Sequence, residues 1–540
     1  MEKSNMNNSY KLIEDGRKDE LWKKHCGYLS LSRKEFRDIQ TRLLLEQINL
    51  LRSSKIGRTL MGGTIPASLE EFRQVTPLTT YMDYSDFLKD KKEESLPEKP
   101  YVWARTSGKS SALGPKWIPY TRAMYDRLSD PGTAAMIMSS CSQPGDVRLE
   151  RNDKFLMATA PPPYLTGYIS RSVKENLGVV FLPNLDEGEK MAYGERVALG
   201  FKLAMHEGLD YFFGISVVLA RMGEQFGQQS SNSTPSKELL NPSTLWRLLK
   251  AVIIAKIHKR DILPKDIWHL KGIITSGTDT EIYTDRIEHY WGRRPLEGYA
   301  CTEAGNMAMQ SWNYKGMVFF PDISFLEFIP LEEYQKNQDD PSYQPKTVLY
   351  DELDLGIYEL VLSNFYGGVL VRYRIGDLFE VIANADKEIG SPLPQMKFYS
   401  RADDIIDLGS FLRLTERDIW KTIEKTGLEY VDWVAIKENS AVYPTLHLYI
   451  ELAKPGSVSE EKVQEKIRQS FSSNFSDYND MKEILNTEPV ALTLLPGGAF
   501  SEYTRLKVEN GAELAHLKPA HMKPSKDILM KLINTTNETK

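Results

Sequence analysis

A loop rich in small and hydroxyl-bearing side chains follows a short predicted strand near residue 105. Small residues let consecutive backbone N–H groups curl into an anion-binding nest, while hydroxyls and lysines add donors and positive charge. A Walker A loop would need a glycine where Trp103 stands, so that type of phosphate loop is excluded. The pattern predicts a phosphate site, but alone it is equally typical of an ordinary Gly/Ser surface loop. The loop is Thr106-Ser107-Gly108-Lys109-Ser110-Ser111-Ala112-Leu113-Gly114-Pro115-Lys116.

A second segment, residues 297–303 (EGYACTE), combines three groups suited to a nucleotide. The Tyr299 ring could stack on a base, the Thr302 hydroxyl could bind phosphate, and the Glu303 carboxylate could hold Mg²⁺, which prefers hard oxygen ligands. No histidine base is paired with the adjacent Cys301 by the pattern, so a small buried thiol is favoured over a nucleophile.

Two segments nearer the C-terminus add a carboxylate and a hinge. Tyr-Arg-Ile-Gly-Asp at 373–377 closes a predicted hairpin and places Asp377 at a turn, where it can accept hydrogen bonds from two ribose hydroxyls. The stretch at 399–409 is charged and lies where the character of the sequence changes, which is typical of a hinge between domains. Taken alone, each segment is more simply explained as a surface turn or a solvated charge cluster.

Patterned elements surround these segments. Apolar residues at helical spacing predict a core-facing helix over 33–52 and a second helix, containing Leu245 and Leu249, that Ser243 caps. Segments 357–363 and 369–374 flank Asn-Phe-Tyr-Gly-Gly, whose glycines allow a tight hairpin.

The last part of the chain has a different pattern. Alternation over 446–452 predicts a half-exposed strand, and a capping box of Ser457 and Glu460 predicts the start of a helix. Residues 490–495 follow as another strand. Residues 401–540 therefore resemble a compact α+β unit attached to a larger α/β body.

The composition is that of a soluble globular protein of 540 residues, long enough for roughly two to four domains. Its 68 basic and 74 acidic residues leave a net charge of −6 with both signs scattered, which provides neither a basic face for nucleic acid nor a polybasic anchor for a membrane. Three separated cysteines fit no disulfide framework or metal site. Because no apolar leader or membrane span is visible, we expect a cytoplasmic protein.

The four segments occur in the order of the motifs of the adenylate-forming superfamily, which includes acyl-CoA synthetases, peptide-synthetase adenylation domains and luciferases. They resemble, in turn, T-S-G-T-T-G-x-P-K, Y-G-x-T-E, Y-R-x-G-D and the hinge motif G-R-x-D-D-x-I-K-x-x-G. The phosphate loop departs from the common form, because it is longer and has Lys109 where Thr or Ser is usual.

Within the superfamily the chain is most similar to the auxin-conjugating type of acyl-acid amido synthetase. Residues 325–330 (FLEFIP) resemble that family's F-x-E-F-I-P, and residues 369–377 resemble G-L-Y-R-Y-R-V-G-D. Residues 516–521 (HLKPAH) are loosely similar to Q-Y-K-x-P-R but lack its arginine.

This resemblance implies an α/β fold in two parts. A large N-terminal ATP- and acyl-binding domain, residues 1–400, would combine mixed sheets packed with helices and a small barrel-like β part. A small mobile α+β domain, residues 401–540, would follow a hinge near 401–409.

The resemblance also implies site residues. Thr106, Ser107, Gly108, Lys109 and Ser110 would bind the β- and γ-phosphates of ATP. Glu303 would hold Mg²⁺ and Thr302 would bind the α-phosphate. The remaining nucleotide contacts would be Tyr299, Ala300, Gly277 and Thr278 around adenine, Asp377 at ribose, and Arg401, with Arg413 and Lys518 as further catalytic residues beside Glu303.

The implied activity is adenylation of a carboxylic acid by ATP, followed by transfer of the acyl group to an amine or amino acid. Two alternatives stay open: acyl transfer to the thiol of coenzyme A or a carrier protein, and a non-catalytic acyl- or nucleotide-binding relative. The partners expected are a small-molecule carboxylic acid and an amine or amino acid, with a carrier protein as an open alternative and with no nucleic acid and no membrane.

Overall fold

The computed structural model describes residues 8–106, 115–230, 242–276, 280–402, 405–408, 412–439, 444–475, 478–479, 482, 488–509 and 520–535. The chain divides into two compact units, of which the larger extends to residue 398 and the smaller holds residues 399–540. Part of the hinge predicted at 401–409 lies outside the described residues, and the hinge stays a prediction.

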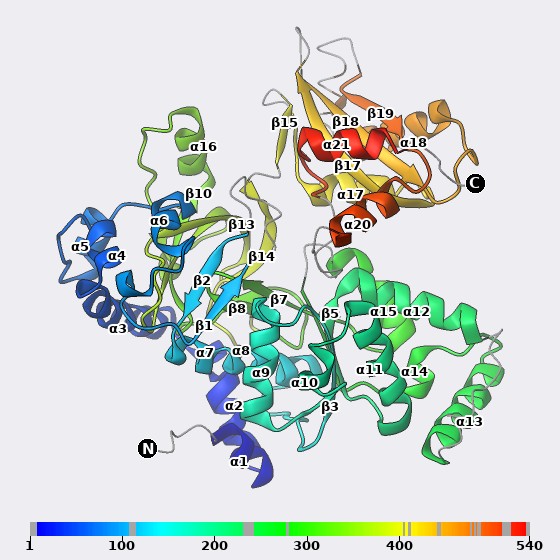
Figure 1. Ribbon diagram of the computed structural model, residues 1–540, viewed down its shortest axis with the longest axis horizontal. Helices are drawn as coiled ribbons and strands as arrows, with labels where there is room; N and C mark the ends of the chain where they lie inside the picture. The colour runs from blue at the N-terminus through cyan, green and yellow to red at the C-terminus, as the bar shows by residue number, and fades with distance from the viewer. Residues whose placement is uncertain are drawn as a thin grey trace. The chain divides into compact units, whose positions relative to one another are not determined.

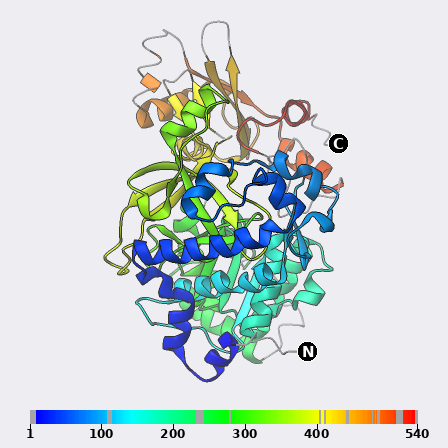
Figure 2. The ribbon, with the colours of Figure 1, turned by 90° about the vertical axis from the view of Figure 1, so that its left-hand side faces the viewer.

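The larger unit begins with a set of helices in which α3 is the longest. This helix, Arg33–Arg52, starts at a capping box between Ser32 and Glu35 and buries Phe36 and Leu44 on one face, as the helical spacing predicts. The Phe36 ring stacks on Tyr350 with the ring centroids 4.1 Å apart. Figure 2 shows α3 as the long dark-blue helix. Its neighbours are α1 (Asn8–Glu14), α2 (Lys18–Cys26), α4 (Lys55–Leu60), α5 (Leu69–Val75) and α6 (Ser85–Leu88).

A twelve-stranded sheet forms the centre of this unit, in the order β11-β10-β12-β13-β14-β9-β8-β7-β6-β5-β3-β4 (Figure 1). The run from β4 to β7 is parallel, and the run from β7 to β11 is antiparallel wherever its register is recorded. The parallel strands are β3 (Lys154–Ala158), β4 (Val180–Leu182), β5 (Tyr211–Ile215), β6 (Gly272–Ser276) and β7 (Leu296–Cys301). The others are β8 (Gly305–Gln310), β9 (Met317–Phe319), β10 (Ser324–Pro330), β11 (Val348–Leu349), β12 (Gly356–Asn364), β13 (Tyr373–Ala383) and β14 (Gln395–Arg401).

Strand β7 is the point at which the sheet changes from parallel to antiparallel. It runs parallel to β6 and antiparallel to β8. Ligands of open α/β sheets bind where the strand arrangement changes, beyond the carboxyl ends of the parallel strands. The predicted segment 297–303 occupies this position.

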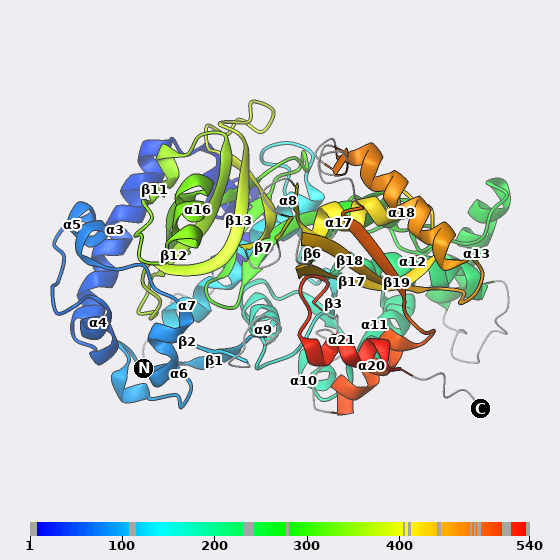
Figure 3. The same cartoon turned by 90° about the horizontal axis from the view of Figure 1, so that it is seen from above.

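Helices connect the parallel strands and cover them. Helix α8 (Ser129–Ser140) precedes β3 and packs on β6. The connections contain α9 (Leu165–Leu177), α10 (Leu185–Gly188), α11 (Tyr193–Glu207), α12 (Ser216–Ser230), α13 (Pro242–Ile257), α14 (Pro264–Ile267) and α15 (Thr280–Trp291). Helix α13 begins at Pro242, so Ser243 lies inside the helix and the predicted cap was wrong, because proline suits the first helical position. Helix α16 (Leu331–Asp339) packs on the antiparallel strands β10 and β12 (Figure 3).

The predicted hairpin exists as β12 and β13, but its second strand begins four residues later than the sequence indicates. Val361 pairs with Arg374 and Leu362 with Tyr373, so residues 365–372 form the connection. Asp377 therefore lies within a strand and not at a turn, which corrects the prediction. Gly376 next to it has φ +79°, and the register shifts between Glu359 and Val361, so a bulge re-aims this part of β13.

A two-stranded ribbon lies before the main sheet along the chain. It pairs β1 (Val102–Arg105) with β2 (Trp117–Tyr120), and α7 (Arg122–Arg127) follows directly. The loop between the two strands contains the residues that were predicted to bind phosphate. Residues 107–114 of this loop lie outside the described residues.

The smaller unit is an α+β structure. Strands β17 (Tyr430–Asn439), β18 (Pro444–Leu452) and β19 (Val490–Leu494) form its sheet, and β15 (Ile406–Leu408) pairs with β16 (Leu412–Leu414). Its helices are α17 (Glu416–Glu424), α18 (Glu460–Asn474), α20 (Ala499–Glu509) and α21 (Lys526–Ile533). Helix α18 buries Val463, Ile467 and Phe471 as predicted, but Ser459 and not Ser457 occupies its N-cap. The mixed α/β fold with a C-terminal α+β unit agrees with the sequence prediction.

Candidate nucleotide and acyl site

Tyr299 and Asp377 form a buried pair at the centre of the larger unit. The Tyr299 hydroxyl donates a hydrogen bond of 2.6 Å to Asp377 Oδ2, although the two residues are 78 positions apart in the chain. The Tyr299 ring packs edge-on against Phe379 with centroids 4.7 Å apart. Burial, and then the negative charge of Asp377, raise the pKa of Tyr299 well above its usual value, so the phenol stays a donor at every physiological pH.

Lys116 joins the first predicted segment to the second and third. Its Nζ lies 4.0 Å from Glu303 Oε1 and donates a hydrogen bond of 3.1 Å to the hydroxyl of Tyr373. At the base of the loop, Thr106 N donates to the Lys116 carbonyl at 3.0 Å, and Lys116 N donates to Thr106 Oγ1 at 2.9 Å. The segments that follow β1, precede β2 and follow β7 therefore meet the first residue of β13 at one place, and Lys116 supplies a positive charge there.

The turn after β7 holds the predicted phosphate and metal residues. Tyr120 donates its hydroxyl to the carbonyl of Thr302 at 2.9 Å, and Asn364 Nδ2 donates to the carbonyl of Glu303 at 3.0 Å. Gly305 closes the turn with φ +90°, a conformation that L side chains rarely adopt. Side chains from β2 and β12 therefore hold the backbone of this turn through its carbonyl groups.

Cys301 is unsuited to nucleophilic catalysis. Burial first, and then the nearby charges of Glu303 and Asp377, raise the pKa of its thiol well above the usual value. Its Sγ lies 3.7 Å from the sulfur of Met307. The thiol therefore stays protonated and packs as a small apolar group, in agreement with the interpretation of the sequence.

A metal ion would have a single carboxylate at this site. Glu303 is 7% exposed, and among the described residues no group of three or more His, Cys, Asp or Glu side chains could hold a metal by itself. Mg²⁺ keeps several waters and is usually held by one or two carboxylates together with substrate phosphates. The donor set thus fits Mg²⁺ that arrives with a nucleotide and does not fit a permanent metal centre.

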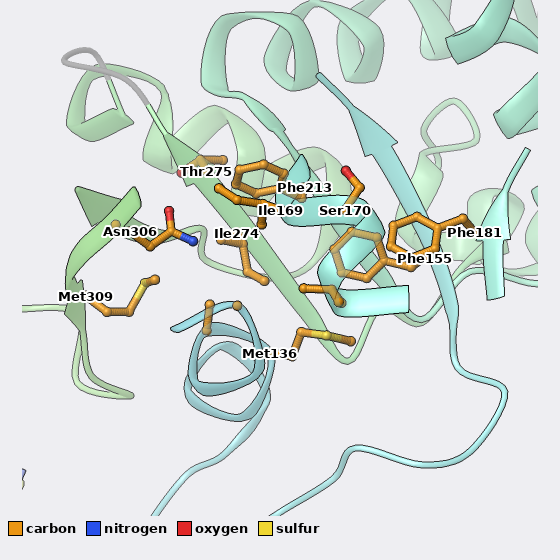
Figure 4. Close-up of a pocket in the computed structure, with 14 residues that line it drawn as sticks. Met136, Phe155, Ile169, Ser170, Phe181, Phe213, Ile274, Thr275, Asn306 and Met309 are labelled. Carbon is orange, nitrogen blue, oxygen red and sulfur yellow. The ribbon is translucent and has the colours of Figure 1, made fainter. Parts of the chain in front are cut away.

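An apolar pocket opens beside β6 and β7. It encloses an empty volume of about 510 Å³, part of which is open to solvent, and Ile274, Thr275 and Gly298 line it from these two strands. Asn306 and Met309 of β8 face Phe155 and Phe181 across the pocket (Figure 4). None of its fourteen described lining residues is ionisable. A largely apolar lining with a few polar groups is typical of small-molecule sites.

A buried ion pair anchors the connection that precedes Asp377. Arg372 donates from Nε and Nη2 to the two carboxylate oxygens of Glu327 at 3.0 and 2.9 Å, and from Nη1 to the carbonyls of Arg73 and Thr76 at 2.8 and 2.6 Å. Glu327 is the acid of the FLEFIP segment. This segment and the start of β13 are therefore bound to each other across the sheet.

Several predicted residues are not tested by this geometry. Arg401 belongs to the smaller unit, Ala300 is exposed on β7, and the side chain of Arg413 lies outside the described part of the chain. Their roles stay predictions. The same holds for the predicted residues outside the described ranges, which are Ser107, Gly108, Lys109, Ser110, Gly277, Thr278 and Lys518.

Lys116 and the Tyr299–Asp377 hydrogen bond are the functional features that the sequence reasoning missed. Lys116 is the last residue of the phosphate loop and matches the lysine of T-S-G-T-T-G-x-P-K, so the motif itself contained the signal. No local signal in either segment points to the hydrogen bond, because it joins two strands.

Two family models match the chain. The GH3 family N-terminal domain matches residues 28–158, and the GH3 family central domain matches residues 317–401. These two regions of the chain are similar to domains of the GH3 family. The two matches include Thr106, Lys116, the Glu327–Arg372 pair and Asp377.

Individual GH3 proteins and more distant enzymes share features with this chain. It is 27% identical over 154 residues to the 4-substituted benzoates-glutamate ligase GH3.12 of Arabidopsis thaliana, a match that covers 27% of this chain and only 24% of that relative. The structure of AtGH3.15 acyl acid amido synthetase in complex with 2,4-DB has a TM-score of 0.66 at 15% identity and covers 94% of both chains. A 2-hydroxyisobutyryl-CoA ligase in complex with 2-HIB-AMP has a TM-score of 0.58 at 14% identity, covering 86% of both chains. These structural matches establish the fold.

Proposed function

We propose that this protein is an ATP-dependent ligase that adenylates a carboxylic acid and transfers the acyl group to an amine or amino acid, forming an amide. The observation that carries the proposal is the convergence of Thr106, Lys116, Glu303 and Tyr373 just beyond the end of β7, the strand that also contributes Gly298 to the apolar pocket. The names of the relatives support an amide-forming ligase, and the proposal extends that activity to this chain.

In the first step the substrate carboxylate attacks the α-phosphorus of ATP. An O–P bond forms, the bond from the α-phosphorus to its bridging oxygen breaks, and pyrophosphate leaves. No protein nucleophile is needed, because the carboxylate is already ionised at neutral pH and the reaction depends on positioning and charge neutralisation. Mg²⁺ would neutralise charge on the phosphates. The side chain of Lys116 supplies a further positive charge.

The other side chains position the nucleotide in this scheme. Asp377 would accept hydrogen bonds from the ribose hydroxyls, and Thr302 would bind the α-phosphate. In the second step the amine attacks the acyl carbon, AMP leaves, and the nitrogen loses a proton. The roles of Arg401, Arg413 and Lys518 in that step belong to the proposal as the resemblance implies them.

The pocket indicates the class of acid. Among the described residues, the lining is aromatic and aliphatic and has no ionisable side chain, which favours a single-carboxylate acid with an apolar or aromatic body. Against these described side chains, a second anionic group on the substrate would be buried without a partner, which is costly.

Acid-dependent exchange of labelled pyrophosphate into ATP tests the first step, and the product formed with amino acids or coenzyme A tests the second. We expect exchange with apolar acids and an amide product. Glu303→Ala should abolish exchange without unfolding the protein, whereas Glu380→Ala, which removes an exposed carboxylate from β13, should leave exchange unchanged. Exchange with no acid in a preparation that binds ATP would support the non-catalytic alternative, and a thioester without an amide would support the coenzyme A alternative.

A further inference from the structure

Helix α13 presents its large apolar side chains to solvent. Leu245, Trp246, Leu249, Ile253 and Ile257 are 48, 68, 53, 51 and 70% exposed. We call these five residues the apolar face of α13. The buried side of the same helix carries the small residues Thr244, Ala251 and Ala255. An ordinary surface helix has the opposite arrangement, with its apolar stripe turned to the core.

The five side chains form one continuous stripe. Leu245, Leu249, Ile253 and Ile257 follow each other at intervals of four residues, and Trp246 lies beside them on the same side of the helix. At a rise of about 1.5 Å per residue the stripe is about 18 Å long. Figure 1 shows α13 at the edge of the larger unit, next to α14, with which it packs. Large exposed apolar patches on soluble proteins mark surfaces that bind something.

The charged side chains of the α13 segment itself are all positive. Residues 242–260 contain no Asp or Glu, and Lys250 and Lys256 are exposed within the same arc of the helix. Within the described part of the chain, neither lysine has a carboxylate partner. The nearest recorded polar contact of Lys250 is His269 Nε2 at 3.5 Å from its Nζ. The face therefore combines apolar contact area with positive charge from its own helix, and the neighbouring carboxylates of Glu207, Asp210 and Asp266 lie on the Trp246 and Lys250 side only.

We propose that the apolar face of α13 binds the surface of an anionic lipid membrane. Helices that lie in the membrane interface have an apolar side with Trp and aliphatic residues and lysines on the flanks, whose long stems reach the headgroups. A single convex helix needs no complementary groove on a fluid surface. No described helix is long and apolar enough to cross a membrane, so the contact would be peripheral.

A second copy of this chain fits the face less well. In a two-fold symmetric contact the same patch of both copies meets, which would bring Lys250 and Lys256 close to their own equivalents. An anionic surface instead attracts these lysines. The proposal differs from the prediction of no membrane partner because that prediction used the charge distribution of the whole chain, whereas α13 is locally basic. It does not depend on the proposed ligase activity.

Sedimentation of the full-length protein with lipid vesicles tests the proposal. We expect binding to vesicles of phosphatidylcholine with one-third phosphatidylglycerol, and at least tenfold weaker binding to phosphatidylcholine alone. Replacing Leu249 and Ile253 together by Gln should weaken binding at least about tenfold, because the apolar contact is lost. Each of Lys250→Gln and Lys256→Gln should weaken it about fivefold, since a lysine near an anionic surface contributes about 1 kcal/mol.

The matched control is Leu355→Gln, which changes a leucine that is 63% exposed elsewhere in the same unit and should bind like the unchanged protein. All these side chains are exposed, so thermal unfolding should be unaltered in every variant. Three results would overturn the proposal: no binding to the anionic vesicles, equal binding by the Leu249/Ile253 variant, or a dimer in analytical ultracentrifugation that this variant abolishes. The last result would identify a second copy as the occupant.

Discussion

The hydrogen bond between Tyr299 and Asp377 should control how well the site binds ATP. Tyr299→Phe removes one hydroxyl and keeps the ring in contact with Phe379, so the packing of the core is preserved. Asp377 is 7% exposed, and water therefore replaces the lost donor poorly. A carboxylate that has lost its donor can turn away from the direction in which it would accept hydrogen bonds from ribose.

The magnitude follows from the charge on the acceptor. Hydrogen bonds to charged groups contribute about 1.5–3 kcal/mol, and each 1.4 kcal/mol corresponds to about a tenfold change in an equilibrium constant. Because Asp377 has further contacts, we take the lower half of this range and expect the KM for ATP to rise about ten- to thirtyfold. The KM for the acid should stay within about twofold of the unchanged enzyme, since the acyl pocket is not altered.

The assay is acid-dependent pyrophosphate exchange measured across ATP concentrations. Tyr350→Phe is the matched control, because Tyr350 is equally buried in the same unit and donates its hydroxyl to the neutral carbonyl of Pro394 at 3.3 Å. That variant should keep its KM for ATP. If Tyr299→Phe also kept its KM for ATP, or if both variants raised it equally, the hydrogen bond to Asp377 would have no positioning role.

Three further outcomes are expected. Lys116→Met should lower kcat for pyrophosphate exchange about a hundredfold, because it removes a positive charge beside Glu303. Lys116→Arg keeps that charge and should retain most of the activity. Equal rates for the two variants would contradict this prediction. Glu327→Gln should lower the free energy of unfolding in urea by about 3–5 kcal/mol, since buried Arg372 loses its charged partner, and the double change of Glu327 and Arg372 to Met should cost less. Burial, aided by Lys24, lowers the pKa of His25 to about 3, so the unfolded chain takes up a proton from about pH 6.5 downward while the folded chain does not, and stability is lost as the pH falls. Between pH 7 and 5 this costs about 2 kcal/mol, and His25→Gln should remove that part of the pH dependence of thermal unfolding; an unchanged pH profile would refute it.

The sequence by itself was sufficient to single out the candidate site residues. Thr106, Tyr299, Glu303 and Asp377 were found because their motifs are short and depend on residue types at fixed local spacing. Helix 33–52 and the buried positions of α18 were equally clear, because helical periodicity is a local property. The Gly/Ser character of the loop at 106–116 indicated a phosphate site without any knowledge of its neighbours.

Tertiary structure decided how these residues act together. Asp377 lies in a strand because the hairpin pairs Leu362 with Tyr373, a register that no local pattern specifies. The contacts of Tyr299 with Asp377 and of Lys116 with Glu303 arise because distant strands become neighbours in one sheet. The tertiary structure also decided which side of α13 packs against the protein. Because this helix has apolar residues on both its small-residue side and its large-residue side, its sequence is compatible with burial of either side. Local spacing fixes residue chemistry and backbone preference, whereas sheet register and packing fix which side chains meet.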